Sequence, residues 1–157
     1  MISVGVKLLT DTAIIPRKAH PSDAAFDLYA NAAAVVNPQT TVVVGTGVAL
    51  DLPSDLCAFV MSRSGMAAKS GLFVLNSPGL IDSGYRGEIK AILHNCGNNP
   101  ILLKSNDRIA QLFFNRVAPI TLAEVVILSS TDRKDNGLGS TGVEYLMDED
   151  GYPSAPI

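Results

Sequence analysis

The sequence is dominated by short apolar runs in which every second residue shares a face, separated by turn-forming clusters. The runs "SVGVKLL", "TVVVGTGVALDL", "EIKAILHN", "RIAQLFFNRV" and "LAEVVIL" contain many β-branched residues, and a period of two is typical of strands. In the first run this period places Val4, Val6 and Leu8 on one face. The clusters "RKAHPSD", "NPQT", "LPSD" and "NCGNNP" predict turns. Many short strands at regular spacing predict an all-β sandwich or barrel.

Two segments depart from this pattern. The stretch "SGMAAKSG" predicts one short helix of one or two turns, with Ser64 as a possible cap and Gly71 as its end. After Ser129 the sequence is rich in Gly, Ser, Asp and Pro and has almost no apolar period. We therefore expect a single domain with a β-barrel core at 1–129 and a flexible C-terminal arm at 130–157.

The shortage of charge suggests that the chain associates with copies of itself. Charged residues make up 17% of the 157 residues, below the roughly 25% of an average soluble protein. A net charge of −3 and a pI near 5.2, with no basic stripe, make nucleic acid an unsuitable main partner. A free nucleotide remains compatible, because a few well-placed Arg residues can bind its phosphates.

The cysteines and the apolar runs predict a cytosolic location. Cys57 and Cys96 are too few for a disulfide framework or a zinc site, and we expect both to be buried thiols in a reducing compartment. The N-terminus lacks the pattern of a secretory leader. No run approaches the roughly eighteen apolar residues of a membrane helix, so no membrane partner is expected.

Two predicted strands carry polar residues among apolar ones. "SDAAFDLYA" contains Asp27, which either faces outward or is paired with a cation, because an unpaired inward carboxylate would be unstable. "NDRIAQLFF" contains Gln111 within a buried strand, and a buried amide needs hydrogen-bond partners. For Gln111 a purely structural hydrogen bond is the alternative to a role in binding.

Two other stretches are suited to binding phosphate. "MSRSGMAAKSG" sets Arg63, Ser64 and Gly65 where a helix would begin, and free N–H groups beside a guanidinium suit anionic oxygens. The glycine-rich "RKDNGLGSTG" offers N–H and hydroxyl donors to the same kind of ligand. An ordinary helix start and an ordinary linker are the respective alternatives.

The stretch "NSPGLIDSGYRGE" places the carboxylate of Asp82 between an apolar pair and a Ser-Gly turn. It predicts a tight hairpin whose backbone groups can read the edge of a flat polar ring, with Asp82 beside the bound molecule. The alternative is a hairpin in which Asp82 only caps the turn.

In this order the five stretches resemble the five motifs of the trimeric dUTP pyrophosphatases (dUTPases), from about Ser22 to Gly142. The resemblance implies a jelly-roll-like distorted barrel with one short helix, and a homotrimer whose active sites are shared between subunits. It implies Mg²⁺-dependent hydrolysis of dUTP to dUMP and pyrophosphate. Such a reaction limits uracil incorporation into DNA and supplies dUMP for thymidylate synthesis.

The resemblance also implies a role for each matched residue. Asp82 matches the general base, and Asp27 matches the carboxylate that contacts magnesium through water. The substrate-binding matches are Arg63, Ser64, Gly65 and Gln111 for the phosphates, Asn76, Gly79, Leu80 and Ile81 for uracil, Tyr85 for deoxyribose, Lys90 for a further substrate contact, and Arg133, Leu138, Ser140 and Thr141 in the arm that closes over the substrate.

Several positions depart from the family pattern. Leu138 stands where the family usually has a Phe that stacks on uracil, and base–aromatic stacking is worth roughly 1–3 kcal/mol, so we predict a looser lid. Lys134 and Asn136 replace common glycines of the arm, Ala25 that of the first motif and Asn106 that of the fourth. Residues 143–157 have no assigned role.

Two other functions compete with dUTP hydrolysis. A dCTP deaminase-like enzyme of the same fold needs a catalytic Glu on the strand after the hairpin, where this chain has Ala91, Ile92 and Leu93, with Glu88 still at the turn. The second alternative is a nucleotide-sensing, protein-binding module, for which the additional C-terminal tail leaves room.

Overall fold

The computed structural model describes residues 2–132 and residue 134, and its first compact unit ends at Ile120. Within these residues the structure is β-rich with one short helix, as the alternating pattern predicts. The elements are β1 (Gly5–Leu8), β2 (Phe26–Tyr29), β3 (Ala34–Val36), β4 (Thr41–Gly45), β5 (Val48–Asp51), β6 (Leu56–Met61), α1 (Ser64–Ser70), β7 (Leu72–Val74), β8 (Gly79–Ile81), β9 (Lys90–Asn95), β10 (Ile101–Leu103) and β11 (Arg108–Arg116). No helix among them is long and apolar enough to cross a membrane.

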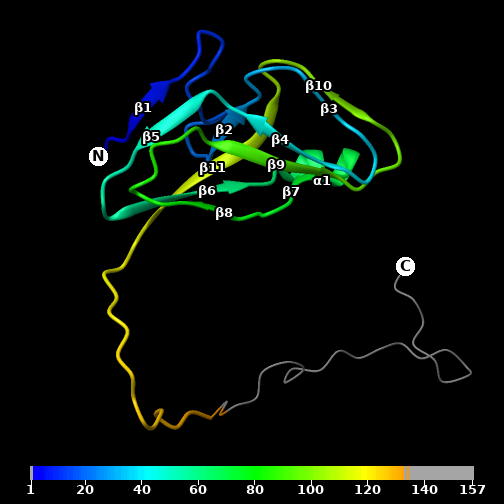
Figure 1. Cartoon of the computed structure of the whole chain (residues 1–157). Helices are drawn as coiled ribbons and strands as arrows, with labels where there is room; N and C mark the ends of the chain where they lie inside the picture. The colour runs from blue at the N-terminus through cyan, green and yellow to red at the C-terminus, as the bar shows by residue number, and fades with distance from the viewer. Residues whose placement is uncertain (1, 133, 135–157) are drawn as a thin grey trace, which may run out of the picture. The chain divides into compact units, whose positions relative to one another are not determined.

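The strands form four antiparallel sheets that together make the expected distorted jelly roll (Figure 1). The largest sheet has the order β2-β11-β6-β8, and a second has the order β4-β9-β7. The pairs β1-β5 and β10-β3 complete the set. Most neighbours within a sheet are distant in sequence, so the fold brings the separate sequence motifs next to one another.

The core lies where the inward faces of these sheets meet. Leu28, Leu72, Leu93 and Leu112, from four different strands, are each at most 1% exposed. Burying a side chain of this size contributes about 1.5–3 kcal/mol. The alternation that predicts strands at β4, β9 and β11 is therefore the alternation between core and surface.

The helix α1 begins one residue earlier than the predicted cap suggests. Arg63, in an extended conformation, occupies the N-cap position without a side-chain cap, and Ser64 is the first helical residue. The predicted end is confirmed: Gly71 adopts the left-handed conformation with φ of 66°, and its N–H donates to the carbonyl of Ala67.

The turn before β11 explains one departure from the family pattern. Asn106 has φ of 72°, a left-handed conformation that Gly adopts freely and that Asn tolerates better than most residues. The carboxylate of Asp107 accepts from the N–H of Lys104 across the same turn. Asn106 is therefore a workable substitute for the usual glycine.

Three expectations are wrong. Cys57 is buried, but Cys96 is exposed because it follows the last residue of β9. The run at 122–128 forms no strand, since no other segment of the described chain pairs with it. The stretch around Asp82 is not a hairpin: β7 pairs with β9 and β8 pairs with β6, so this stretch crosses between two sheets.

Candidate active site

Three neighbouring strands gather the polar residues of the first, second and fourth motifs. β11 pairs with β2 on one side and β6 on the other, which aligns Gln111 with Asp27 and Met61. Arg63 follows two residues after Met61, at the start of α1. A cavity of about 530 Å³ opens here, and its lining includes Asp27, Arg63, Ser64, Gly65, Arg108 and Gln111.

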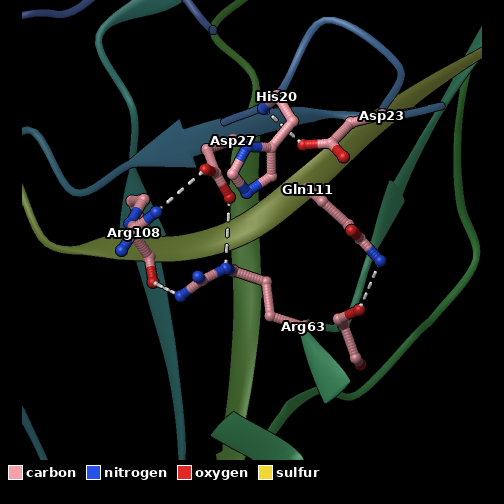
Figure 2. Close-up of polar contacts among 7 residues, drawn as sticks. His20, Asp23, Asp27, Arg63, Arg108 and Gln111 are labelled. Atoms are coloured by element: carbon pink, nitrogen blue, oxygen red, sulfur yellow. Dashed lines mark hydrogen bonds and ion pairs between the residues drawn. The ribbon is translucent and has the colours of Figure 1, made fainter. Parts of the chain in front are cut away.

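Asp27 is paired with two guanidinium groups at this cavity (Figure 2). Its carboxylate lies 3.2 Å from Nε of Arg63 and 3.4 Å from Nη1 of Arg108, with its side chain only 14% exposed. Arg63 also donates through Nη1 to the carbonyl of Arg108, at 2.9 Å. The inward carboxylate is thus compensated, and Arg63 is held at both Nε and Nη1.

Gln111 is held by Ser62, the residue that follows strand β6. Its Nε2 donates to the main-chain carbonyl of Ser62 at 2.9 Å, and the side chain is half-buried. The amide keeps a carbonyl oxygen and one N–H for a ligand in the cavity. Gln111 therefore makes a structural hydrogen bond and also lines the cavity. The two alternatives from the sequence, a structural role and a role in binding, are compatible.

The remaining wall of the cavity is formed by the loop before β2. Asp23 lies on this wall, and its carboxylate accepts from the N–H of His20 at 2.8 Å (Figure 2). Ala25, which stands in place of the family's usual glycine, lines the same cavity, so its methyl group takes space that a glycine would leave open.

The third motif forms a separate surface. Asn76 is exposed after β7, and Gly79, Leu80 and Ile81 form β8 on the edge of the β6 ladder. Asp82 is exposed in the turn that follows, where its carbonyl accepts from the N–H of Tyr85 at 3.1 Å. Among the described residues the Asp82 carboxylate makes no ion pair, so it is available to a water molecule. We call residues 76–85 the base segment.

Tyr85 is folded back on its own turn. Its hydroxyl donates to the carbonyl of Glu88 at 3.0 Å, and a Cβ at Gly87 would collide with that hydroxyl. Glu88 is held in turn, because its Oε1 accepts from the N–H of Gly47 at 2.9 Å. Lys90 is exposed on β9, 3.7 Å from the Glu88 carboxylate. This network fixes the ring of Tyr85 on the surface beside Asp82.

No residue of the base segment lines the cavity formed by the first, second and fourth motifs. The cavity holds the matched residues of the first, second and fourth motifs, whereas Asn76, Gly79–Ile81, Asp82, Tyr85 and Lys90 lie outside its lining. The predicted arm residues Arg133, Leu138, Ser140 and Thr141, with Asn136, lie outside the described residues.

Sequence reasoning missed three residues of this site. Arg108 pairs with Asp27, Ser62 holds Gln111, and Glu88 holds the Tyr85 hydroxyl. The position of Arg108, three residues before Gln111 in a buried strand, is a weak signal. The roles of Ser62 and Glu88 arise from main-chain carbonyls, which have no signature in the sequence.

The fold and the cavity define a class: an all-β protein with a cavity lined by guanidinium, hydroxyl and amide donors, groups that suit a phosphorylated ligand. The dUTPase family model matches residues 11–142. The chain therefore belongs to the dUTPase family.

Individual relatives agree with this assignment. The chain is 41% identical to the deoxyuridine 5'-triphosphate nucleotidohydrolase of Clostridium acetobutylicum, over 92% of this chain and 99% of that one. It is 44% identical to the enzyme of the same name from Clostridioides difficile, over 90% and 99%. A mutant dUTPase of Staphylococcus bacteriophage 80alpha, solved with dUpNHpp, has a TM-score of 0.82 and 27% identity, covering 91% of this chain and all of that one.

Proposed function

We propose that this chain hydrolyses dUTP to dUMP and pyrophosphate, as a homotrimer that uses Mg²⁺. The observation that carries the proposal is the grouping of Asp27, Arg63 and Gln111 at one cavity by β2, β11 and β6 in a member of the dUTPase family. Arg63 and Gln111, with the N–H groups at the start of α1, are the donors for the phosphate chain. Arg133, Ser140 and Thr141 are proposed to add donors from the arm.

Asp82 is the proposed general base. It would hold a water molecule and accept its proton as the water oxygen bonds to the α-phosphorus. The bond from that phosphorus to the bridging oxygen breaks, and pyrophosphate leaves with the electron pair. The exposed Asp82 carboxylate, without an ion pair among the described residues, supports this role.

The base segment is proposed to select uracil and deoxyribose. Uracil presents a carbonyl acceptor at C4 and an N3–H donor, whereas cytosine presents an amino group and an N3 acceptor. Backbone groups from Gly79 to Ile81, fixed for the first pattern, would be left unpaired by the second, which is a strong basis for rejection. Asn76 supports this edge, and Tyr85, fixed by Glu88, would pack under the sugar and exclude a 2′-hydroxyl.

The separation of the two surfaces supports a composite site. The base segment lies outside the lining of the phosphate cavity, so a second chain would complete each site. The run at 120–128 also supports assembly, because Leu122, Val126 and Ile127 are each more than 80% exposed. Such exposure of large apolar side chains is typical of surfaces that are covered by a partner.

Mg²⁺ fits this chain as an ion that arrives with the triphosphate. Among the described residues no three His, Cys, Asp or Glu side chains form a metal cluster, and both oxygens of Asp27 face guanidinium groups. Asp27 would therefore contact the ion through water. When bound, Mg²⁺ neutralises charge on the phosphate oxygens.

The structure gives no support to deamination of dCTP. The β9 positions where that chemistry needs a Glu hold Ala91, Ile92 and Leu93, and Ala91 and Leu93 are fully buried. Glu88 is engaged by Gly47 and Lys90. A cytosolic location remains a prediction of the sequence.

One assay tests the proposal: pyrophosphate release from dUTP, dCTP, dTTP and UTP, with and without Mg²⁺, with ammonia measured in parallel. We expect pyrophosphate from dUTP in the presence of Mg²⁺ and little from the other three. Intact dUTP in that reaction, or ammonia from dCTP, would overturn the assignment. Light scattering at assay concentration tests the trimer, which a monomeric mass would exclude.

A further inference from the structure

Ser62 bonds to three residues, in β11 and in the stretch 74–77, through three different groups. Its carbonyl accepts from Gln111 Nε2 at 2.9 Å, and its N–H donates to the hydroxyl of Ser77 at 3.2 Å. Its own hydroxyl accepts from the N–H of Val74 at 2.9 Å. Val74 is 1% exposed, so loss of the Ser62 hydroxyl would leave a buried donor without its partner, which is unfavourable.

These three bonds connect the two halves of the site within one chain. Gln111 lines the phosphate cavity, and Arg63 directly follows Ser62. Ser77 directly follows Asn76 in the base segment, and Val74, the last residue of β7, lies two residues before Asn76. The ladder between β6 and β8 covers Ala58 to Val60 only. Beyond it, Ser62, the residue after β6, is attached to Val74 at the end of β7 and to Ser77 of the base segment.

We infer that Ser62 is a positioning residue that couples the phosphate cavity to the base segment of the same chain. When Gln111 moves, Ser62 moves with it, and the shift is transmitted to Val74 and Ser77. The reason is that Gln111, Val74 and Ser77 are all hydrogen-bonded to Ser62. In a trimer with composite sites, these two halves belong to different active sites, so Ser62 joins neighbouring sites. This inference rests on the proposed dUTP hydrolysis.

Four variants of the full-length chain test the inference. Ser62→Ala removes the hydroxyl that accepts from Val74, and Ser62→Thr retains a hydroxyl. Ser77→Ala removes the acceptor of the Ser62 N–H. Ser70→Ala is the matched control, because its hydroxyl also makes a single hydrogen bond to the main chain, to Met66, but within the exposed face of α1.

Three quantities are measured for each variant: kcat and KM for dUTP, the ratio of kcat/KM for dUTP to that for dCTP, and the inhibition constant of inorganic pyrophosphate. A merely structural role would lower the amount of folded enzyme and with it kcat for both nucleotides, leaving the ratio unchanged. Pyrophosphate probes the phosphate cavity, which Ser77 does not line.

We expect Ser62→Ala and Ser77→Ala to raise the KM for dUTP and to lower the ratio of kcat/KM for dUTP to that for dCTP by roughly five- to tenfold, which is within the effect of losing one hydrogen bond. Ser62→Thr should recover most of the ratio, and Ser70→Ala should match the wild type. Ser77→Ala should also weaken inhibition by pyrophosphate by roughly threefold, which is within the range of measured couplings between connected residues.

An unchanged nucleotide ratio in Ser62→Ala, or a Thr variant no better than the Ala variant, would overturn the positioning role. Unchanged pyrophosphate inhibition in Ser77→Ala would overturn the coupling. The wild-type enzyme separates this inference from the proposed function. If it fails to cleave dUTP, the proposed function is wrong, whereas wild-type activity with unaffected variants refutes only the role of Ser62.

Discussion

Asp27 fixes Arg63 in the proposed phosphate cavity, with the carboxylate 3.2 Å from the guanidinium Nε and only 26% of the Arg63 side chain exposed. The same carboxylate lies 3.4 Å from Nη1 of Arg108. A guanidinium held in this way presents its remaining donors to a ligand with little loss of conformational freedom. The first motif therefore acts on the second within one chain.

Replacing Asp27 with Asn should lower kcat for dUTP by about tenfold, because Arg63 loses its orientation while its charge stays in the cavity. The KM should change by less than about threefold for the same reason. Steady-state pyrophosphate release measures both. Asp55→Asn is the matched control: it removes an exposed ion pair with Arg116, and such pairs contribute little. Equal kinetics for the two variants would contradict an orienting role.

Asp82→Asn should lower kcat for dUTP by at least about a hundredfold, since a general base contributes roughly 10²- to 10⁴-fold. Binding of a non-hydrolysable dUTP analogue, measured by calorimetry, should stay within a few-fold of wild type. Asp11→Asn removes an exposed carboxylate in the β1–β2 connection and should leave the rate unchanged. Near wild-type turnover in Asp82→Asn would exclude this residue as the base.

Gly87→Ala should reduce discrimination between dUTP and UTP. A Cβ at this position would collide with the Tyr85 hydroxyl. The Tyr85 ring must therefore move away from the position in which its hydroxyl donates to the Glu88 carbonyl. Tyr85→Phe removes only the hydroxyl bond and should have a smaller effect. The ratio of kcat/KM for the two nucleotides decides this, and thermal unfolding checks that both variants fold. If Tyr85→Phe reduces this ratio as much as Gly87→Ala does, the hydroxyl hydrogen bond and not the position of the ring determines the discrimination.

The left-handed turn at Asn106 makes a prediction about stability. Asn106→Ala should reduce the free energy of unfolding by about 1 kcal/mol, because a residue with a Cβ and no local polar group is disfavoured at φ of 72°. Asn106→Gly should be at least as stable as the wild type. Urea unfolding followed by tyrosine fluorescence or circular dichroism measures both. An Ala variant more stable than the Gly variant would be inconsistent with this turn.

The proposed composite site predicts complementation between two inactive variants. Arg63→Ala removes the phosphate half and Asp82→Asn the base half. When the two variants are unfolded together and refolded as a mixture, about one quarter of the sites should combine two intact halves if the halves come from different chains. Refolding each variant alone is the control. No regained activity in the mixture would place both halves in one chain.

The strands of the core were predictable because burial follows the alternation. β4, β9 and β11 coincide with the apolar runs, and their inward residues include Val44, Leu93 and Leu112. The run at 122–128 has the same alternation but forms no strand. Alternation in the sequence indicates that a segment can form a strand. A second strand must also lie beside it to complete the hydrogen-bond ladder.

The site was predictable only where a motif carries a distinctive side chain. Asp27, Arg63 and Gln111 meet at one cavity as the motif order suggests. The pairing of Asp27 with Arg108 depends on the register between β2 and β11, which shifts between Arg108 and Ala110, and no sequence pattern specifies that irregularity. The separation of Asp82 from the cavity also depends on sheet topology alone.

The exposed apolar run at 122–128 has a consequence for how the protein is made. Val126 is fully exposed and Leu128 is 83% exposed, in a segment with the composition of an aggregation-prone strand. In the proposed trimer, a chain that has folded but has not yet assembled would expose this segment to aggregation. The yield of folded protein in overproducing cells should therefore improve when slower synthesis allows the chains to assemble before they aggregate.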